Sequence, residues 1–276
     1  MDKLLFGTGG TPHGGKSSSS VAGIQRIAEL GLDCMELEFV RGVHMGKETA
    51  LQVAATAKNL KIRLTAHAPY FINLHATDPE IIEGSKYHIL QTARIASLCG
   101  AESVNFHAGV YEGDAPETVY EIVKKNFSEV LIQIRKEKIN LWIRPEVLGK
   151  STQFGTLEEI IKLSSEFEGV LPTIDFAHWH ARTGKYNSYT EFSGMLEQME
   201  NKLGRRAIEH MHMHISGIKY GAKGELAHLN FADSDFNYKE LVKALKDHNA
   251  RGFAICESPN LEEDARKLKD TYNSLR

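Results

Sequence analysis

The stretch SVNFHAG (103–109), with ETVYEIVKKNFSEVLIQIRKE (117–137) and INLWIRPE (139–146) after it, has the form of strand, helix and strand. The two outer segments are short and contain several β-branched and aromatic residues, as strands do. The middle segment has apolar residues at the helical spacing of i, i+3, i+4 and i+7. This order is typical of a β-α-β unit, in which a helix connects two parallel strands.

The same alternation continues along the whole chain, with amphipathic patterns such as VAGIQRIAEL (21–30) between the strand-like runs. Eight such units predict an α/β fold, a (β/α)₈ TIM barrel formed as a single domain by residues 1–276. A doubly wound sheet is the main alternative, but the glycine fingerprint G-x-G-x-x-G is missing after the first strand. The expected strands are 3–7, 34–40, 62–68, 103–109, 139–146, 169–176, 208–216 and 253–258.

The net charge, the cysteines and the lack of long apolar runs limit the kinds of protein that this chain can be. The chain has 276 residues and a net charge of −3, so no global positive field attracts it to nucleic acid or anionic membranes. Its three cysteines are an odd number without a C-x-x-C pair, which favours free thiols in a reducing compartment. No apolar run approaches the ~20 residues of a membrane span, and the first residues lack an apolar signal segment. We therefore expect a cytoplasmic protein without a membrane or protein partner, as a monomer.

Metal-binding side chains stand where six successive expected strands end. In TIM barrels the active site lies at the carboxyl ends of the strands. One histidine or acid at such a position is more often solvated or hydrogen-bonded than ligating, but six in succession are hard to obtain by chance. The 13 histidines of the chain also exceed the usual number for this length. The six residues are His67, His107, Glu146, Asp175, His214 and Glu257.

These donors are imidazoles and carboxylates, without thiolates. Such a set suits Zn²⁺, Mn²⁺ or Fe²⁺ better than Ca²⁺ or Mg²⁺, which favour oxygen shells. Six or more ligands exceed what one tetrahedral ion uses, so we expect more than one metal. Two ions about 3.5–4 Å apart would suit displacement at phosphorus.

Around these residues the sequence resembles the endonuclease IV family (AP endonuclease family 2), metal-dependent apurinic/apyrimidinic DNA endonucleases of the xylose-isomerase-like TIM-barrel superfamily. HAPYFINL (67–74) resembles the family segment H-x-x-Y-L-I-N-L, and NFHAG (105–109) resembles NFHPG. The likeness covers most of the chain in order, and this succession is more specific than any single motif. The remaining matches are PEVLGKSTQFG (145–155), TIDFAH (173–178), MHIS (213–216) and ICES (255–258).

The resemblance implies a phosphodiester hydrolase of DNA repair that cuts 5′ to an abasic site, with DNA containing such sites as its partner. It implies two or three zinc ions, with Mn²⁺ or Fe²⁺ at some sites. Glu146 would bridge two metals as the catalytic residue, and Tyr70 would bind substrate at the lesion. The implied ligands are His67, His107 and Glu146 for the first metal, Glu146, Asp175, His214 and Glu257 for the second, and His178 and His228 for the third.

Two departures from the family affect these expectations. The family's third site uses a D-x-H pair, whereas KGELAHLNF (223–231) has no Asp two residues before His228. Glu225, three residues before it, could substitute with a different geometry. MHIS also lacks the Asn-Asp that follows the family histidine.

The main alternative function is a single-metal sugar isomerase or epimerase of the same superfamily. Its metal would need only Glu146, Asp175, His214 and Glu257. The additional His67, His107, His178 and His228 favour the multinuclear hydrolase, while the missing Asp and the negative net charge favour the isomerase. A metal-dependent binding protein is a third reading, but structural zinc sites are usually closed and rich in cysteine.

Three other histidines receive no ligand role. We expect His180 at the surface or supporting the site from behind. His210 and His212 alternate with His214 along the seventh strand, and we expect them in the barrel interior or in packing contacts.

Overall fold

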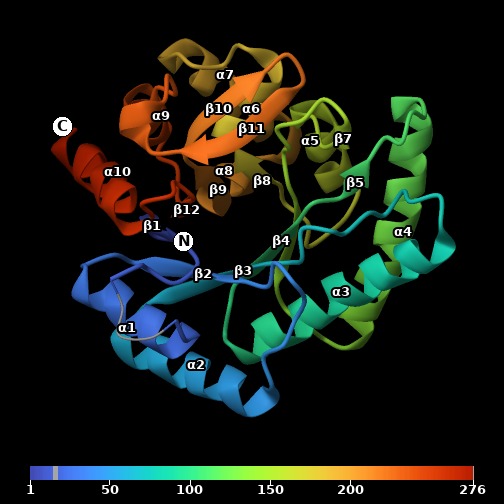
Figure 1. Cartoon of the computed structure of the whole chain (residues 1–276), viewed down its shortest axis with the longest axis horizontal. Coiled ribbons are helices and arrows are strands. Elements are labelled where there is room, and N and C mark those ends of the chain that lie inside the picture. Colours follow the sequence, from blue (N-terminus) through green and yellow to red (C-terminus); the bar gives the residue numbers. More distant parts are fainter. Residues whose placement is uncertain (15–17, 276) are drawn as a thin grey trace.

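Eight parallel strands form the centre of the computed structural model, which describes residues 1–14 and 18–275 (Figure 1). They pair in the order β6-β4-β3-β2-β1-β12-β9-β8. Isolated parallel bridges from Ile143 to Val170 and from Glu146 to Thr173 bring the two outer strands together. The sheet therefore nearly closes, and the predicted TIM barrel is confirmed. The strands are β1 (Leu4–Gly9), β2 (Cys34–Glu38), β3 (Arg63–His67), β4 (Ser103–Phe106), β6 (Trp142–Pro145), β8 (Thr173–Asp175), β9 (Met211–Ile215) and β12 (Gly252–Cys256).

Helices surround the barrel, and their starts follow from local capping (Figure 1). The Asp78 side chain accepts a hydrogen bond from the Glu80 amide at the start of α3, and Thr156 and Glu159 form a capping box at the start of α5. Within the described part of the chain, none of the helices has the length and apolar character that crossing a bilayer requires. The helices are α1 (Ser20–Glu29), α2 (Lys47–Leu60), α3 (Pro79–Leu98), α4 (Pro116–Lys136), α5 (Leu157–Ser165), α6 (Phe176–Thr183), α7 (Tyr189–Leu203), α8 (Arg206–Glu209), α9 (Tyr238–Asp247) and α10 (Glu262–Ser274), with a 3₁₀ turn η1 (Phe231–Asp233).

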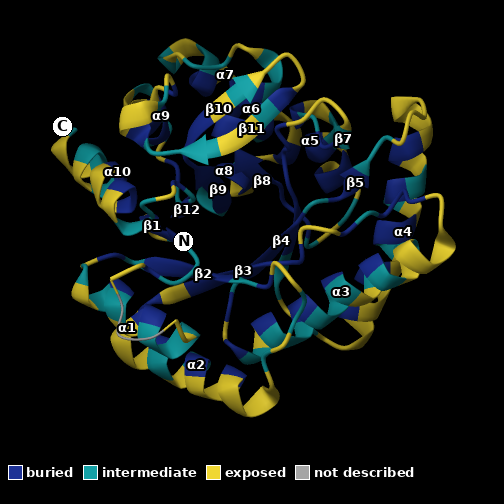
Figure 2. Ribbon diagram, in the orientation of Figure 1, coloured by how far each residue is buried: buried dark blue, intermediate teal, exposed yellow. Residues whose placement is uncertain are grey.

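The inside of the barrel is polar, although the strands are buried (Figure 2). Side chains alternate between the two faces of a strand, so Met35 and Leu37 of β2 belong to the hydrophobic core while Glu36 between them has polar neighbours. TIM barrels more often fill this space with branched apolar residues. The buried polar side chains that the strands contribute include Glu36, Thr65, Ser103, Asn105, Arg144, His212 and His214.

Two short antiparallel pairs were not expected from the sequence: β10 (Gly217–Gly221) with β11 (Gly224–Leu229), and β5 (Gly109–Val110) with β7 (Gln153–Phe154). The β10–β11 hairpin follows β9 at the carboxyl end of the barrel. Its turn touches the loop after β6, where Lys150 bridges Gly224 and the Glu225 amide donates to the Gly149 carbonyl at 3.0 Å. Gly224 has a φ of +95°, and a Cβ there would lie 2.0 Å from the Gly149 oxygen, so this approach requires glycine.

Seven of the eight expected strands are shorter than predicted, and for the sixth and seventh a neighbouring helix is the reason. Residues 206–209 form α8, so His210 precedes β9, and its ring packs 5.8 Å from that of Trp142. His212 lies inside the barrel as expected. The sixth strand ends at Asp175 because Phe176 already begins α6.

Candidate metal centre

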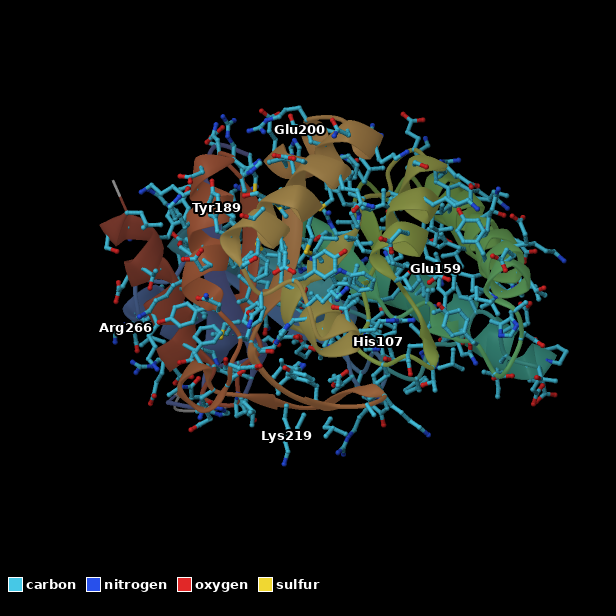
Figure 3. All side chains as sticks on the ribbon, turned by 90° about the horizontal axis from the view of Figure 1, so that it is seen from above. His107, Glu159, Tyr189, Glu200, Lys219 and Arg266 are labelled. Carbon is cyan, nitrogen blue, oxygen red and sulfur yellow. The ribbon has the colours of Figure 1, made fainter. Side chains whose placement is uncertain are left out.

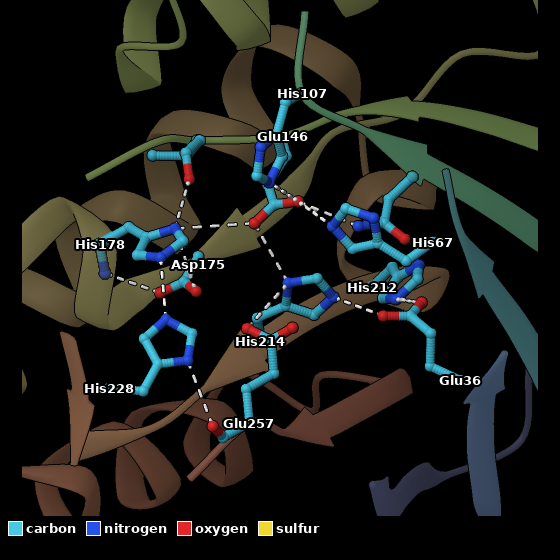
Figure 4. Close-up of polar contacts among 12 residues, drawn as sticks. Glu36, His67, His107, Glu146, Asp175, His178, His212, His214, His228 and Glu257 are labelled. Atoms are coloured by element: carbon cyan, nitrogen blue, oxygen red, sulfur yellow. Dashed lines mark hydrogen bonds and ion pairs between the residues drawn. The ribbon is translucent and has the colours of Figure 1, made fainter. Parts of the chain in front are cut away.

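The eight predicted ligands gather at one end of the barrel (Figure 4). His67 and Asp175 are the last residues of β3 and β8, and His214 lies in β9. His107, Glu146 and Glu257 directly follow β4, β6 and β12. His178 comes from α6 and His228 from the β10–β11 hairpin. Figure 3 shows His107 on the side of the molecule where Lys219 projects from this hairpin.

Glu146 is the centre of this arrangement. Its carboxylate is 1% exposed, and four imidazoles surround it. One oxygen, Oε2, lies 3.3 Å from Nε2 of His67 and 3.5 Å from Nε2 of His107. The other, Oε1, lies 3.1 Å from Nδ1 of His214 and 3.6 Å from Nδ1 of His178. The two oxygens thus face two different groups of donors, as a bridging carboxylate requires.

Three groups of donor atoms adjoin one another, and within each the atoms lie within 4.8 Å of one another. Glu146 belongs to two of the groups and Asp175 to two, so the three are contiguous. Glu257 lies beside the middle group, with Oε2 3.5 Å from Nδ1 of His214. The groups are His67–His107–Glu146, Glu146–Asp175–His214 and Asp175–His178–His228.

The position of Asp175 explains why His178 follows it by three residues in TIDFAH (173–178). It is the N-cap of α6, and its Oδ1 accepts the His178 amide at 2.7 Å. This cap places the His178 ring one helical turn later beside the same carboxylate. The other oxygen, Oδ2, is buried without a hydrogen bond among the described residues, although Nδ1 of His178 lies 3.2 Å away. A buried carboxylate oxygen without a hydrogen bond fits a cation ligand.

The charges of the cluster are strongly coupled. Burial alone would raise the pKa of Glu146, but His214 and His107 hold it well below its ordinary value. Burial alone would lower the pKa of His67, but a hydrogen bond to Glu146 and the charge of Glu38 raise it to about 10. Burial raises the pKa of Asp175 to about 6, despite the opposite effect of His178. Imidazoles that hold protons beside carboxylates have to release them when a cation binds.

The donor atoms of these groups are nitrogens and oxygens only, because none of the groups among the described residues includes a cysteine. This chemistry fits Zn²⁺, Mn²⁺ or Fe²⁺. A cavity of about 270 Å³ opens onto the donors, and its lining includes Glu38, Tyr70, Lys150, Gln153 and Glu225. Tyr70 is 61% exposed at the rim, where its ring lies 5.8 Å from that of Phe71.

Several residues of the site were not predicted from the sequence. Glu38 ends β2 just as His67 ends β3, so the strand-end rule applied to it as well. Together with Glu36 and Glu257 it forms a group of carboxylates within 4.8 Å, and burial raises the pKa of Glu38 to about 8. Asn105, whose amide donates to Glu146 Oε2 at 3.0 Å, points into the barrel two residues before the expected ligand.

His180 lies apart from these donor groups. The expectation of a surface position is wrong, because the residue is 3% exposed. Its Nδ1 lies 2.8 Å from the Lys185 carbonyl, and its ring contacts Tyr220 and Phe236. His180 therefore packs α6 against β10 and the segment before α9, and it does not contact the donor groups.

Comparisons with known proteins agree with this architecture. A family model described as a xylose isomerase-like TIM barrel matches residues 24–276. The uncharacterized protein MJ0133 of Methanocaldococcus jannaschii is 42% identical over 99% of this chain and 98% of its own. A probable endonuclease 4 of Bacillus mycoides is 25% identical, over 80% of this chain and 76% of its own.

Solved structures show the same fold. Endonuclease IV from Thermus thermophilus superposes with a TM-score of 0.76 at 18% identity, covering 99% of this chain and 100% of that one. A D-tagatose 3-epimerase-like protein superposes with a TM-score of 0.72 at 18% identity, covering 97% and 96%. The chain belongs to the xylose isomerase-like TIM barrel family.

Proposed function

We propose that the chain is a metal-dependent apurinic/apyrimidinic endonuclease that hydrolyses the phosphodiester 5′ to an abasic site during DNA repair. The observation that carries this proposal is the contiguity of three donor groups that share Glu146 and Asp175. A single-metal enzyme needs only the middle group. The similarity to probable endonuclease 4 proteins supports the same reading.

The proposed cofactor is two or three zinc ions, with Mn²⁺ or Fe²⁺ as alternatives at some sites. Bound metals of this kind lower the pKa of water and neutralise charge that develops on a phosphate. The chain's own part is to hold the bridging carboxylate of Glu146, to bury the donors and to exclude solvent from them. The assigned ligands are His67, His107 and Glu146 at the first site, Glu146, Asp175, His214 and Glu257 at the second, and Asp175, His178 and His228 at the third.

Glu225 supports the third site despite the missing Asp. Nε2 of His178 lies 3.1 Å from Nε2 of His228 and 3.5 Å from Oε2 of Glu225. The position two residues before His228 is Leu226, which is 62% exposed and offers no donor. We therefore assign a second carboxylate of this site, beside Asp175, to Glu225, which the hairpin turn brings to the cavity.

Tyr70 is the proposed contact to the lesion. Its exposed ring at the cavity rim suits the gap left by a missing base, and aromatic stacking on a base is worth ~1–3 kcal/mol. Tyr70→Ala is expected to weaken binding of abasic DNA by about tenfold in a fluorescence anisotropy titration. Tyr87→Ala removes a similarly exposed ring on α3, outside the cavity, and should bind like the wild type. Equal losses in both variants would contradict the assignment.

The function itself is tested with two kinds of substrate. A duplex with one abasic site, labelled on the damaged strand, is expected to be cut 5′ to the site and to leave a 3′-hydroxyl end. An undamaged duplex of the same sequence is the control. A panel of ketoses, followed by chromatography, is expected to stay unchanged under the same conditions.

A sugar epimerase is the second candidate, and one observation favours it. Glu38 lines the cavity beside Glu257, and these carboxylates are within 4.8 Å of Glu36. Negative charge on such acids opposes the approach of a phosphodiester but not of a neutral ketose, and an acid with a raised pKa such as Glu38 suits proton transfer. Metal-dependent epimerisation of a ketose without DNA incision would establish this candidate and exclude the nuclease.

A further inference from the structure

We propose that Glu36, inside the barrel, is a positioning residue that fixes which nitrogen of His214 faces the metal centre. The inference rests on the proposed function only in taking His214 as a metal ligand, which holds for the hydrolase and the epimerase alike. Glu36 itself is set back from the donors of the middle group, behind His214. Its hydrogen bond reaches the centre through the His214 imidazole.

The His214 ring lies between two carboxylates (Figure 4). Its Nε2 is 2.8 Å from Oε1 of Glu36, and its Nδ1 is 3.1 Å from Oε1 of Glu146. The side chains of His214 and Glu36 are completely buried, so no water competes for either nitrogen. Each nitrogen of the ring therefore faces one carboxylate, Glu36 at Nε2 and Glu146 at Nδ1, in positions that the barrel strands fix.

An ionised carboxylate only accepts hydrogen bonds. Glu36 thus requires a proton on Nε2 of His214, and a neutral imidazole with that proton has its lone pair on Nδ1. That lone pair points to Glu146 and Glu257, where the middle donor group meets. The opposite tautomer would turn an N–H toward the cation and leave Glu36 facing a lone pair. Carboxylates that hold a ligand histidine in this way usually affect metal affinity strongly.

Glu36 is itself held in place on its second oxygen. Oε2 accepts a hydrogen bond from Oγ1 of Thr65 at 2.7 Å and lies 2.9 Å from Nε2 of His212. Nδ1 of His212 in turn lies 2.9 Å from Oγ of Ser103. These contacts tie β2, β3, β4 and β9 together behind the metal centre. The carboxylate therefore cannot rotate away from His214 without breaking contacts to neighbouring strands.

Glu36→Gln tests the proposal, because it keeps the volume and removes the charge and one acceptor oxygen. The matched control is Thr65→Val, which removes a hydrogen bond from the same carboxylate and leaves the Glu36–His214 contact. Zinc affinity is measured by competition with a chromophoric chelator, and bound zinc is counted by mass spectrometry. Glu36→Gln is expected to weaken one zinc site by about 10–100-fold, while Thr65→Val stays within about threefold of the wild type.

The outcomes separate this inference from the proposed function. If the wild type binds no metal, the proposed function fails. If the wild type binds metal and Glu36→Gln binds it equally well, only the positioning role is lost. The role is also lost if Thr65→Val weakens zinc binding as much as Glu36→Gln does.

A measurement on the wild type shows which nitrogen of His214 binds the metal, even if Glu36→Gln does not fold. In ¹⁵N-labelled, zinc-loaded protein the His214 ring is assigned by its absence from the spectrum of His214→Gln. We expect a protonated Nε2 and a metal-bound Nδ1. A metal-bound Nε2 would refute the proposal and would instead place a cation among Glu36, His212 and His214, whose donor atoms also lie within 4.8 Å.

Discussion

Glu146→Gln is expected to reduce kcat/KM for incision of abasic DNA by at least about 10³-fold, because stabilisation of charge by metals is worth several kcal/mol and about 1.4 kcal/mol is tenfold. The carboxylate is shared between the groups of His67 and His214, so both proposed metals depend on it. Glutamine keeps the volume but offers one oxygen and no charge to four surrounding imidazoles. The rate is followed with the labelled abasic duplex.

A glutamate-to-glutamine substitution outside the centre tests whether the loss of rate is specific to Glu146. Glu197→Gln alters an exposed glutamate on α7 and should leave the rate within about twofold. Circular dichroism and thermal unfolding establish that Glu146→Gln is folded. A folded Glu146→Gln that cuts at the wild-type rate would remove Glu146 from the mechanism.

Metal removal is expected to have a comparable effect. Dialysis against a chelator should abolish incision, and added Zn²⁺ or Mn²⁺ should restore it, because the donors cannot activate water without a cation. The purified chain should carry two or three metal ions, counted by mass spectrometry. His228→Gln should bind one ion fewer than the wild type, since His228 belongs only to the third donor group.

His248→Gln is the matched control for this count. His248 lies at the end of α9, outside the donor groups, and the variant should keep all ions. One ion per chain in the wild type would contradict the multinuclear centre and favour the single-metal epimerase. Incision that survives complete metal removal would exclude metal catalysis altogether.

The barrel and the strand-end residues could be predicted because both follow from local periodicity. Parallel strands of a barrel end at the same mouth, so His67, His107 and Glu146 had to be neighbours once the strands were assigned correctly. Asp175 could be placed at the mouth as a strand end, whereas the role of His178 followed only from the family resemblance and its position is set by the cap that Asp175 provides for α6. These features need no knowledge of distant contacts.

The remaining features depend on contacts between distant segments. Glu36 lies in a short strand beside Met35 and Leu37, and nothing in its surroundings in the sequence shows that β9 brings His212 and His214 to its carboxylate. The β10–β11 hairpin is held by its approach to Gly149, which lies far earlier in the sequence. A surface position was one of the two expected for His180, because the sequence does not show that α6 packs against the hairpin.

The donors of the candidate centre come from two kinds of element, because the β10–β11 hairpin meets the loop after β6 at Gly224. His67, His107 and Glu146 come from the rigid barrel, whereas Glu225 and His228 come from an appended ribbon. Insertions or substitutions in the ribbon can thus remodel the cavity wall without disturbing any barrel strand. The shape of the cavity can therefore change with the ribbon alone, while the donors at the strand ends keep their places.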